Sequence, residues 1–439
     1  MNRKPSLLVI FLTVFIDLIG FGIIVPLVPM YSRHYGASGF MIGVVIASFS
    51  AMQFIFSPIW GKLSDRYGRR PILLISTAGA SVSYVIFALA SGLENHAAAL
   101  WLMLVSRMFA GACGGNITVA QAYVADISKP EERSKRMGLI GMAFGLGFIF
   151  GPIISGVALV GFGLGGFWGI PKIVFHGFGP TGPGWAAAGL CAFNFLLAYR
   201  ILVESLKPDS THAGNRPRFA QWGHTLSQPK IGLLILIFFL ATFAFSCFES
   251  TLPLLVSDNF NLGTTVDETK PASTVISLFV FCGVLAALIQ GGLIGRLVKL
   301  FGEPNLISMS LIITGASLVL LPLVKGDGPL SWSKVLHLAD QPWLLMLGAL
   351  VLLSVGSSLS RAPLFGMLSN LTPANEQGAT IGVAQSAGSL ARIVGPLFAA
   401  TLYGHVPMLP YLICGGISIV TGFMVFPLLR GKSEPATAG

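Results

Sequence analysis

Apolar segments long enough to cross a lipid bilayer dominate the sequence. A transmembrane helix needs about 20 apolar residues, and twelve segments meet this requirement. None alternates apolar and polar residues as a strand of a membrane barrel would. The sequence therefore predicts an all-α membrane protein with twelve transmembrane helices. They lie near residues 7–30, 40–60, 72–92, 98–124, 137–160, 184–204, 231–255, 274–294, 305–325, 342–364, 378–402 and 408–429.

The basic residues predict how the chain is oriented. If the N-terminus is cytoplasmic, nineteen Lys and Arg residues lie on the cytoplasmic side and five on the outer side. Basic loops favour the cytoplasm, so we expect both termini there. This asymmetry also accounts for the formal net charge of +10 without a nucleic-acid partner. The partner implied by composition, 54% hydrophobic and 10% charged, is the lipid bilayer.

A polar stretch divides the predicted spans into six plus six. We predict an N-terminal six-helix bundle over 1–204, a cytoplasmic linker over 205–230 and a C-terminal six-helix bundle over 231–439. The Gly-rich outer stretch 161–184 is expected to form a partly interfacial or re-entrant loop.

An internal repeat supports the two halves. Gly61-x-Leu63…Tyr67-Gly68 is echoed by Gly295-x-Leu297…Phe301-Gly302 after the second span of each half. Likewise, Glu132…Gly138…Gly151-Pro152 aligns with Glu376…Gly382…Gly395-Pro396 without gaps. Two matches in the same order indicate duplication, which is common in transporters.

Four stretches carry a resemblance to a known family. Gly61–Pro71, with five charges in eleven residues, resembles the signature loop of the major facilitator superfamily. Arg107-x-x-x-Gly111 is similar to its second motif, and Gly141–Gly156 resembles the fifth-span antiporter motif of its drug/proton exporters. Asp17–Pro29 is similar to the tetracycline-exporter branch.

The resemblance implies two pseudo-symmetric six-helix bundles that export a small amphipathic molecule in exchange for protons, in a bacterial inner membrane. A proton-coupled nutrient importer and a non-transporting membrane sensor of the same fold remain as alternatives. Ser83 and Ala286 stand where tetracycline exporters carry an acid and a histidine, which argues against tetracycline–metal exchange. The resemblance leaves the substrate's identity and charge open, and we expect a monomer.

Four charged residues inside predicted spans are candidates for proton coupling or for the transport cavity. A charged group at membrane depth is costly unless it is paired, so such residues mark functional sites or structural ion pairs. Asp17 could exchange protons, bind a cation or pair with Arg107, and Arg107 is the family's proton-transfer arginine by resemblance. Glu249 could bind a cationic substrate, be a second protonation site or reach outer water. Arg392 needs a carboxylate, backbone carbonyls or an anionic substrate. Uncharged polar residues in the spans could line the cavity or bond between helices. They are Gln53, Asn116, Gln121, Asn194, Gln290 and Gln385.

Two further groups are expected to be structural. A cytoplasmic latch between the bundles is expected from Gly61, Asp65, Arg66, Gly68, Arg69, Arg70 and Asp126. Close helix packing is expected from the antiporter motif, Gly141, Gly145, Gly147, Gly151, Pro152 and Gly156. No metalloprotease, Walker A or clustered His/Cys motif is present, so we expect no enzyme activity, metal or cofactor.

Overall fold

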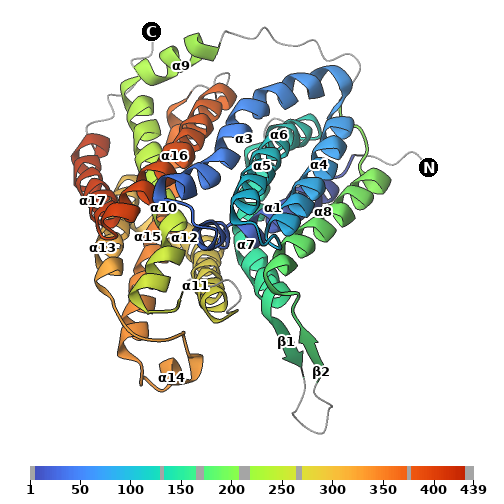
Figure 1. Ribbon diagram of the computed structural model, residues 1–439. Coiled ribbons are helices and arrows are strands. Elements are labelled where there is room, and N and C mark those ends of the chain that lie inside the picture. Colours follow the sequence, from blue (N-terminus) through green and yellow to red (C-terminus); the bar gives the residue numbers. More distant parts are fainter. Residues whose placement is uncertain are drawn as a thin grey trace, which may run out of the picture.

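The computed structural model describes residues 5–128, 133–164, 173–206, 218–263, 269–372 and 377–430. These residues are nearly all helical (Figure 1). The first part of the chain forms α1 (Leu7–Ile24), α2 (Val28–His34), α3 (Gly39–Tyr67), α4 (Arg69–Ala90), α5 (His96–Gly114), α6 (Ile117–Asp126), α7 (Arg133–Val160), β1 (Gly161–Leu164), β2 (Ile173–His176) and α8 (Gly182–Ile201). The second part forms α9 (Arg218–Ser227), α10 (Pro229–Asn259), α11 (Thr269–Leu288), η3 (Ile289–Leu293), α12 (Ile294–Phe301), α13 (Glu303–Leu320), α14 (Trp332–Leu336), α15 (Gln341–Leu371), α16 (Gln377–His405) and α17 (Leu409–Arg430).

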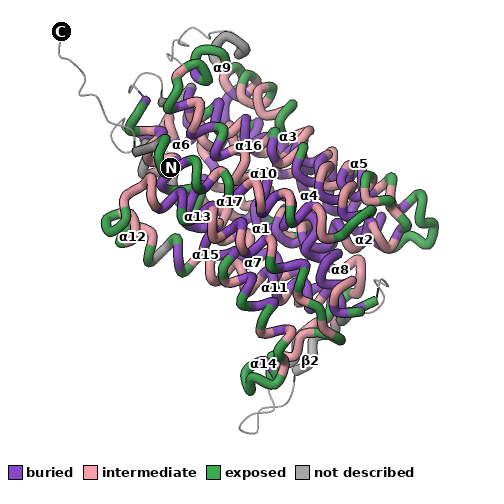
Figure 2. Tube along the Cα trace, turned by 90° about the vertical axis from the view of Figure 1, so that its left-hand side faces the viewer, coloured by how far each residue is buried: buried purple, intermediate pink, exposed green. Residues whose placement is uncertain are grey.

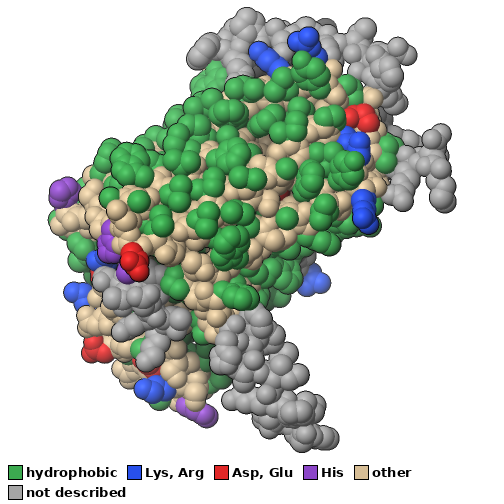
Figure 3. Space-filling view, turned by 45° about the vertical axis from the view of Figure 1, so that its right-hand side comes forward, with side chains coloured by type: hydrophobic (Ala, Val, Ile, Leu, Met, Phe, Trp, Pro, Cys, Tyr) green, Lys and Arg blue, Asp and Glu red, His purple; other side chains and the backbone are tan. Residues whose placement is uncertain are grey.

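Eleven of the twelve predicted spans coincide with described helical segments that are long and apolar enough to cross a membrane. The predicted span 378–402 corresponds to α16, which is not among the eleven although it has 29 residues. This helix packs against α3 and α10, so much of its surface meets protein and can carry polar residues. Figure 3 shows apolar side chains covering the middle of one face, with charged residues gathered toward its ends.

The helices form the two predicted six-helix bundles. In the first, α1 packs on α7 and α8, while α4 packs on α5 and α8. In the second, α10 packs on α16 and α17, while α13 packs on α15 and α17. The main contacts between the bundles are α3 with α16 and α7 with α11 (Figure 1).

The internal repeat is present in the backbone. Gly68 and Gly302 each join two helices with nearly the same dihedral angles, φ 99° and ψ 158° for Gly68 and φ 75° and ψ 157° for Gly302. Only glycine adopts such angles readily, which explains why both copies carry it. Glu132 and Glu376, which belong to the second match of the repeat, lie outside the described residues.

The second match of the repeat marks equivalent helix contacts. A Cβ at Gly151 of α7 would lie 2.6 Å from the Cα of Gly22 in α1, the first helix of its bundle. A Cβ at Gly395 of α16 would lie 2.8 Å from the Cβ of Ser246 in α10, the first long helix of the other bundle. In both halves, the glycine lets the two helices approach more closely than a side chain would allow.

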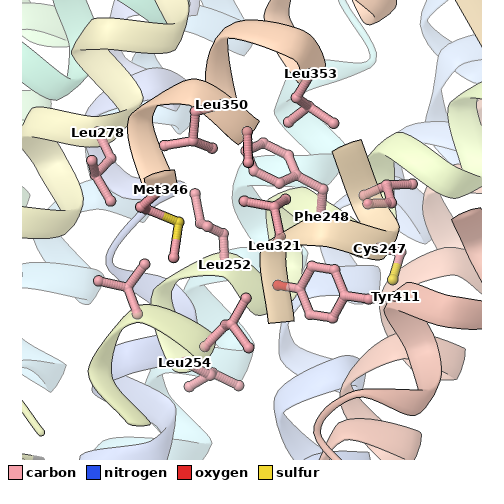
Figure 4. Packing of buried hydrophobic residues seen from close by; sticks show 14 of the residues in the cluster. Cys247, Phe248, Leu252, Leu254, Leu278, Leu321, Met346, Leu350, Leu353 and Tyr411 are labelled. Atoms are coloured by element: carbon pink, nitrogen blue, oxygen red, sulfur yellow. The ribbon is translucent and has the colours of Figure 1, made fainter. Parts of the chain in front are cut away.

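The buried core is organised differently at the two ends of the molecule. We call the end where α1 begins and α17 ends the terminal face, and the end that carries α14 and the β1–β2 ribbon the far face (Figure 1). Toward the far face, one apolar cluster joins Ile42 of α3 to α10, α15 and α17, and another joins Ile276 of α11 to α1, α4 and α8. The first of these clusters is shown in Figure 4, where Phe248, Leu252 and Met346 pack together. Toward the terminal face, the described clusters are confined to one half each.

Three local features differ from the sequence-based expectations. The described part of 161–184 contains an antiparallel ribbon that extends from α7 away from the bundle. Of the two expected forms, the re-entrant loop does not match this ribbon, and the partly interfacial loop stays a prediction; residues 165–172 lie outside the described residues. Helix α9 lies inside the predicted linker and packs on α10 and α16. Residues 207–217 of the linker lie outside the described residues. A π-helical turn, η3, interrupts the predicted eighth span. Figure 2 shows exposed residues concentrated at α9, α12 and α14 and buried ones along the central helices.

Candidate functional site

Asp17 of α1 is held by two amide side chains from other helices. Asn116 Nδ2 donates to its Oδ2 at 2.9 Å, and Asn194 Nδ2 donates to its Oδ1 at 3.4 Å. Asn194 also donates to the carbonyl of Thr13 at 2.8 Å. Both asparagines, predicted as possible substrate-lining residues, therefore orient the acid in this conformation.

Arg107 of α5 is 3% exposed and lies against two aromatic rings. Its guanidinium carbon is 4.7 Å from the ring centre of Phe49 and 5.7 Å from that of Phe21. Its Nε and Nη1 have no hydrogen-bond partner among the described residues. No ion pair or hydrogen bond joins Asp17 to Arg107 within the described chain, so the structural pair considered from the sequence is not formed.

The negative charge that interacts with Arg107 comes from the other bundle. Glu249 of α10 interacts electrostatically with Arg107 and also with Arg392 of α16. Tyr84 of α4 lies within electrostatic range of both Arg107 and Asp17. These groups, from Asp17 in one bundle to Arg392 in the other, thus interact electrostatically with their neighbours in the set. Tyr84 was missed because a tyrosine in an apolar span gives no distinct signal.

Arg392 has a basic neighbour that the sequence interpretation overlooked. Arg361 of α15 interacts electrostatically with Arg392. Arg392 Nη2 lies 3.3 Å from the hydroxyl of Ser389, one helical turn away. Arg361 could have been found from the sequence, because it lies inside the predicted span 342–364 and arginines at membrane depth are rare enough to be candidates for a functional site.

The remaining polar candidates do not share one environment. Gln53 Nε2 donates to the carbonyl of Gly114 at 3.0 Å, which is a bond between α3 and α5. Gln121 and Gln385 are half-buried, and Gln290 is exposed in the π-helical turn. Such turns are frequent at functional sites, so Gln290 remains a candidate.

The predicted latch residues gather around Arg69. Its guanidinium pairs with Asp65 and with Asp126, whose Oδ2 is 3.2 Å from Nε, and its Nη1 lies 2.7 Å from the hydroxyl of Ser64. Ser205 also donates to Asp126 at 2.9 Å. All these residues belong to the first bundle, except Ser205, which is the first residue of the predicted linker. The predicted contact with the second bundle is not made among the described residues, so a latch between bundles stays a prediction for another conformation.

Glu204, just after α8, completes this cluster and was missed. Its carboxylate accepts from the backbone N–H of Arg69 at 2.8 Å and of Arg70 at 3.0 Å, at the start of α4. An acid at a helix N-terminus satisfies free N–H groups and complements the helix dipole. Arg70 in turn donates to the carbonyl of Tyr199 at 2.8 Å. Two other predicted latch residues differ in surroundings: Arg66 is exposed, and Gly61 has open space beside it.

The two bundles are joined at the far face. Arg33 Nη1 of α2 lies 2.6 Å from Asp258 Oδ1 of α10, and Tyr403 of α16 donates to Asp258 Oδ2 at 2.7 Å. A Cβ at Gly43 of α3 would lie 2.9 Å from the Cα of Leu397 in α16. The described conformation therefore holds the bundles together at the far face.

The antiporter-motif residues divide into two sets. Gly147 and Gly151 contact the backbone of α1, and a Cβ at Gly156 would lie 3.2 Å from Ile276 of α11. Pro152 is accommodated inside α7. At Gly141 and Gly145, no atom of another described helix lies within 4 Å of a Cβ position, so the expected close packing does not occur there. These two glycines lie nearer the terminal face, where the described bundles do not share a core cluster.

Comparisons with known proteins agree with this architecture. The family described as "Major Facilitator Superfamily" matches residues 10–338 and 267–439. The tetracycline resistance protein, class C, of Escherichia coli is 29% identical and covers 92% of this chain and 91% of its own length. Multidrug resistance protein 2 of Bacillus subtilis is 28% identical over 100% of this chain and 98% of its own length. The crystal structure of the human organic anion transporter MFSD10 matches with a TM-score of 0.59 and 24% identity, covering 95% of this chain and 98% of that one, and shows the fold alone.

Proposed function

Because the chain belongs to the Major Facilitator Superfamily, whose members are transporters, we propose that it is a proton-coupled antiporter. It would export a small amphipathic molecule by alternating access. The similar tetracycline and multidrug resistance proteins support export. Ser83 and Ala286 depart from the tetracycline-exporter pattern, so we do not assign tetracycline as the substrate.

The observation that carries this proposal is the set of ionisable groups in the spans that interact electrostatically across the two bundles. Glu249 interacts with Arg107 of the first bundle and Arg392 of the second. Protonation of Glu249 would remove the negative charge that attracts both arginines, and so would change the relative energies of bundle arrangements. Asp17 offers a second acid, whose amide partners come from two other helices of its own bundle.

The contacts between the bundles support alternating access. The far face is bridged, whereas the described core clusters near the terminal face stay within one bundle each. We propose that the terminal face is cytoplasmic, as the basic residues indicate, and that this conformation opens toward the cytoplasm. The linker between the bundles and the cluster around Arg69 would then lie on the cytoplasmic side.

Reconstituted vesicles test the proposal. In a panel of anionic, neutral and cationic amphipathic dyes, an imposed pH difference should drive at least one dye against its gradient, and adding that dye should release protons from loaded vesicles. Asp17→Asn should abolish driven accumulation, while the matched control Glu94→Gln, at an exposed loop position, should keep it. Unchanged coupling in Asp17→Asn would exclude that acid. Failure to move any member of a broad dye and drug panel would refute the transport proposal.

A further inference from the structure

Two arginines of the second bundle lie close together without a carboxylate of their own. Arg361 and Arg392, on α15 and α16, are near enough to repel each other. Neither forms an ion pair with a described residue. An unpaired charge at membrane depth is costly, so such a pair calls for a compensating anion.

The nearby negative charge does not balance these arginines. Glu249 is the carboxylate that interacts with Arg392, and it is shared with Arg107. Asp17 is already bound by Asn116 and Asn194. The described groups that interact here thus include three guanidinium groups and one carboxylate, which interacts with two of the three. The local excess of positive charge favours an anion.

Both side chains can be reached from outside the protein core. Arg361 is exposed and Arg392 is half-buried, so neither side chain lies in the close-packed core. Arg361 lies ten residues before the end of α15 and Arg392 lies fifteen residues after the start of α16. At a rise of about 1.5 Å per residue, Arg361 is about 15 Å and Arg392 about 22 Å from the helix end that lies at the terminal face. This is the end where the described core clusters do not join the bundles.

We propose that Arg361 and Arg392 bind the anionic group of the transported molecule, and that the substrate is an amphipathic organic anion. Two guanidinium groups recognise a carboxylate, sulfonate or phosphate through paired N–H donors. This assignment rests on the proposed transport function and names its substrate class. The site is reachable from the terminal face, where a molecule to be exported would bind first.

Binding to the purified full-length protein tests the site directly. The probes are 1-anilinonaphthalene-8-sulfonate and its uncharged parent N-phenyl-1-naphthylamine, measured by equilibrium dialysis in nanodiscs of zwitterionic lipid. The wild-type protein should prefer the sulfonate. Arg361→Gln and Arg392→Gln should each weaken sulfonate binding about tenfold and change binding of the neutral dye less than about twofold. The sulfonate affinity of Arg392→Lys should lie between those of the wild type and Arg392→Gln, because lysine keeps the positive charge but lacks the planar pair of N–H donors.

The control is Arg296→Gln, at an exposed position of α12 outside this pair, which should bind both dyes as the wild type does. Equal weakening of both dyes in the variants, or no preference in the wild type, would overturn the proposal. Binding of phosphatidylglycerol instead of the soluble sulfonate, with the same arginine dependence, would also overturn it, because the site would then hold a lipid headgroup. Thermal unfolding of each variant confirms that it is folded.

Transport separates this inference from the proposed function. If no probe moves under a pH difference while arginine-dependent sulfonate binding persists, the transport proposal fails and the anion site stands. If neutral or cationic dyes are driven across the membrane while the sulfonate neither binds nor moves, transport stands and the anion assignment fails.

Discussion

The contact between the bundles at the far face allows a prediction of how often the bundles separate there. Asp258 accepts a hydrogen bond from Tyr403 and pairs with Arg33 of the other bundle. Asp258→Asn keeps an oxygen that can accept from Tyr403 but removes the charge that attracts Arg33. We expect the far face to open more often, because this contact exists only when the bundles are together there.

The structure sets the size of this effect. The side chains of Arg33 and Asp258 are 33% and 30% exposed, so solvent screens the pair and its contribution is about 0.5–1 kcal/mol. The bond from Tyr403 lies within the second bundle, so it is present in both conformations and does not add to this difference. At the upper end of this range, about 1 kcal/mol changes the ratio of the two conformations about fivefold.

Distances between spin labels measure that ratio. The labels replace Phe40 of α3 and Val406 after α16, which are 60% and 50% exposed and belong to different bundles. Asp258→Asn should increase the fraction of long distances about fivefold. The matched control is Asp327→Asn, because Asp327 bonds to Asn261 at 2.7 Å within the second bundle. An unchanged distribution in Asp258→Asn, or an equal change in the control, would refute the reasoning.

Three more predictions concern packing and the cluster around Arg69. Gly151→Ala should lower the free energy of unfolding by about 1–3 kcal/mol, because the added Cβ would meet the backbone of α1. Gly141→Ala, whose Cβ would have open space, should not lower it, and thermal unfolding in detergent compares the two variants. Glu204→Ala should leave two N–H groups of α4 without their acceptor, at a cost of about 1–3 kcal/mol, and hydrogen exchange at the start of α4 should rise, unlike in the exposed-loop variant Glu94→Ala. Asp65→Lys should slow transport and leave substrate binding intact, if Asp65 acts in a latch; loss of binding in a folded variant would contradict that role.

Several features of the site could be predicted because their signals are local in the sequence. The duplicated Gly68 and Gly302 stand where the backbone needs positive φ, and Gly151 stands where α7 meets α1. Asp17, Arg107, Glu249 and Arg392 could be named as candidates because charges are costly at membrane depth. The glycine spacing of the antiporter motif did not distinguish Gly151 from Gly141, because both match the motif and only the neighbouring helix differs.

The sequence by itself determined the all-helical fold, the approximate spans and the duplication, since these depend on hydropathy and on single backbone positions. Only the tertiary structure decided the partners of each charge. Asp17 bonds to Asn116 and Asn194, while Arg107 interacts with Glu249 of the other bundle. The physical reason is that position along a helix gives the depth of a residue, whereas its neighbours depend on how each helix is rotated and packed. For the same reason, the proximity of Arg361 and Arg392 in the folded protein could not be predicted from their positions in the sequence.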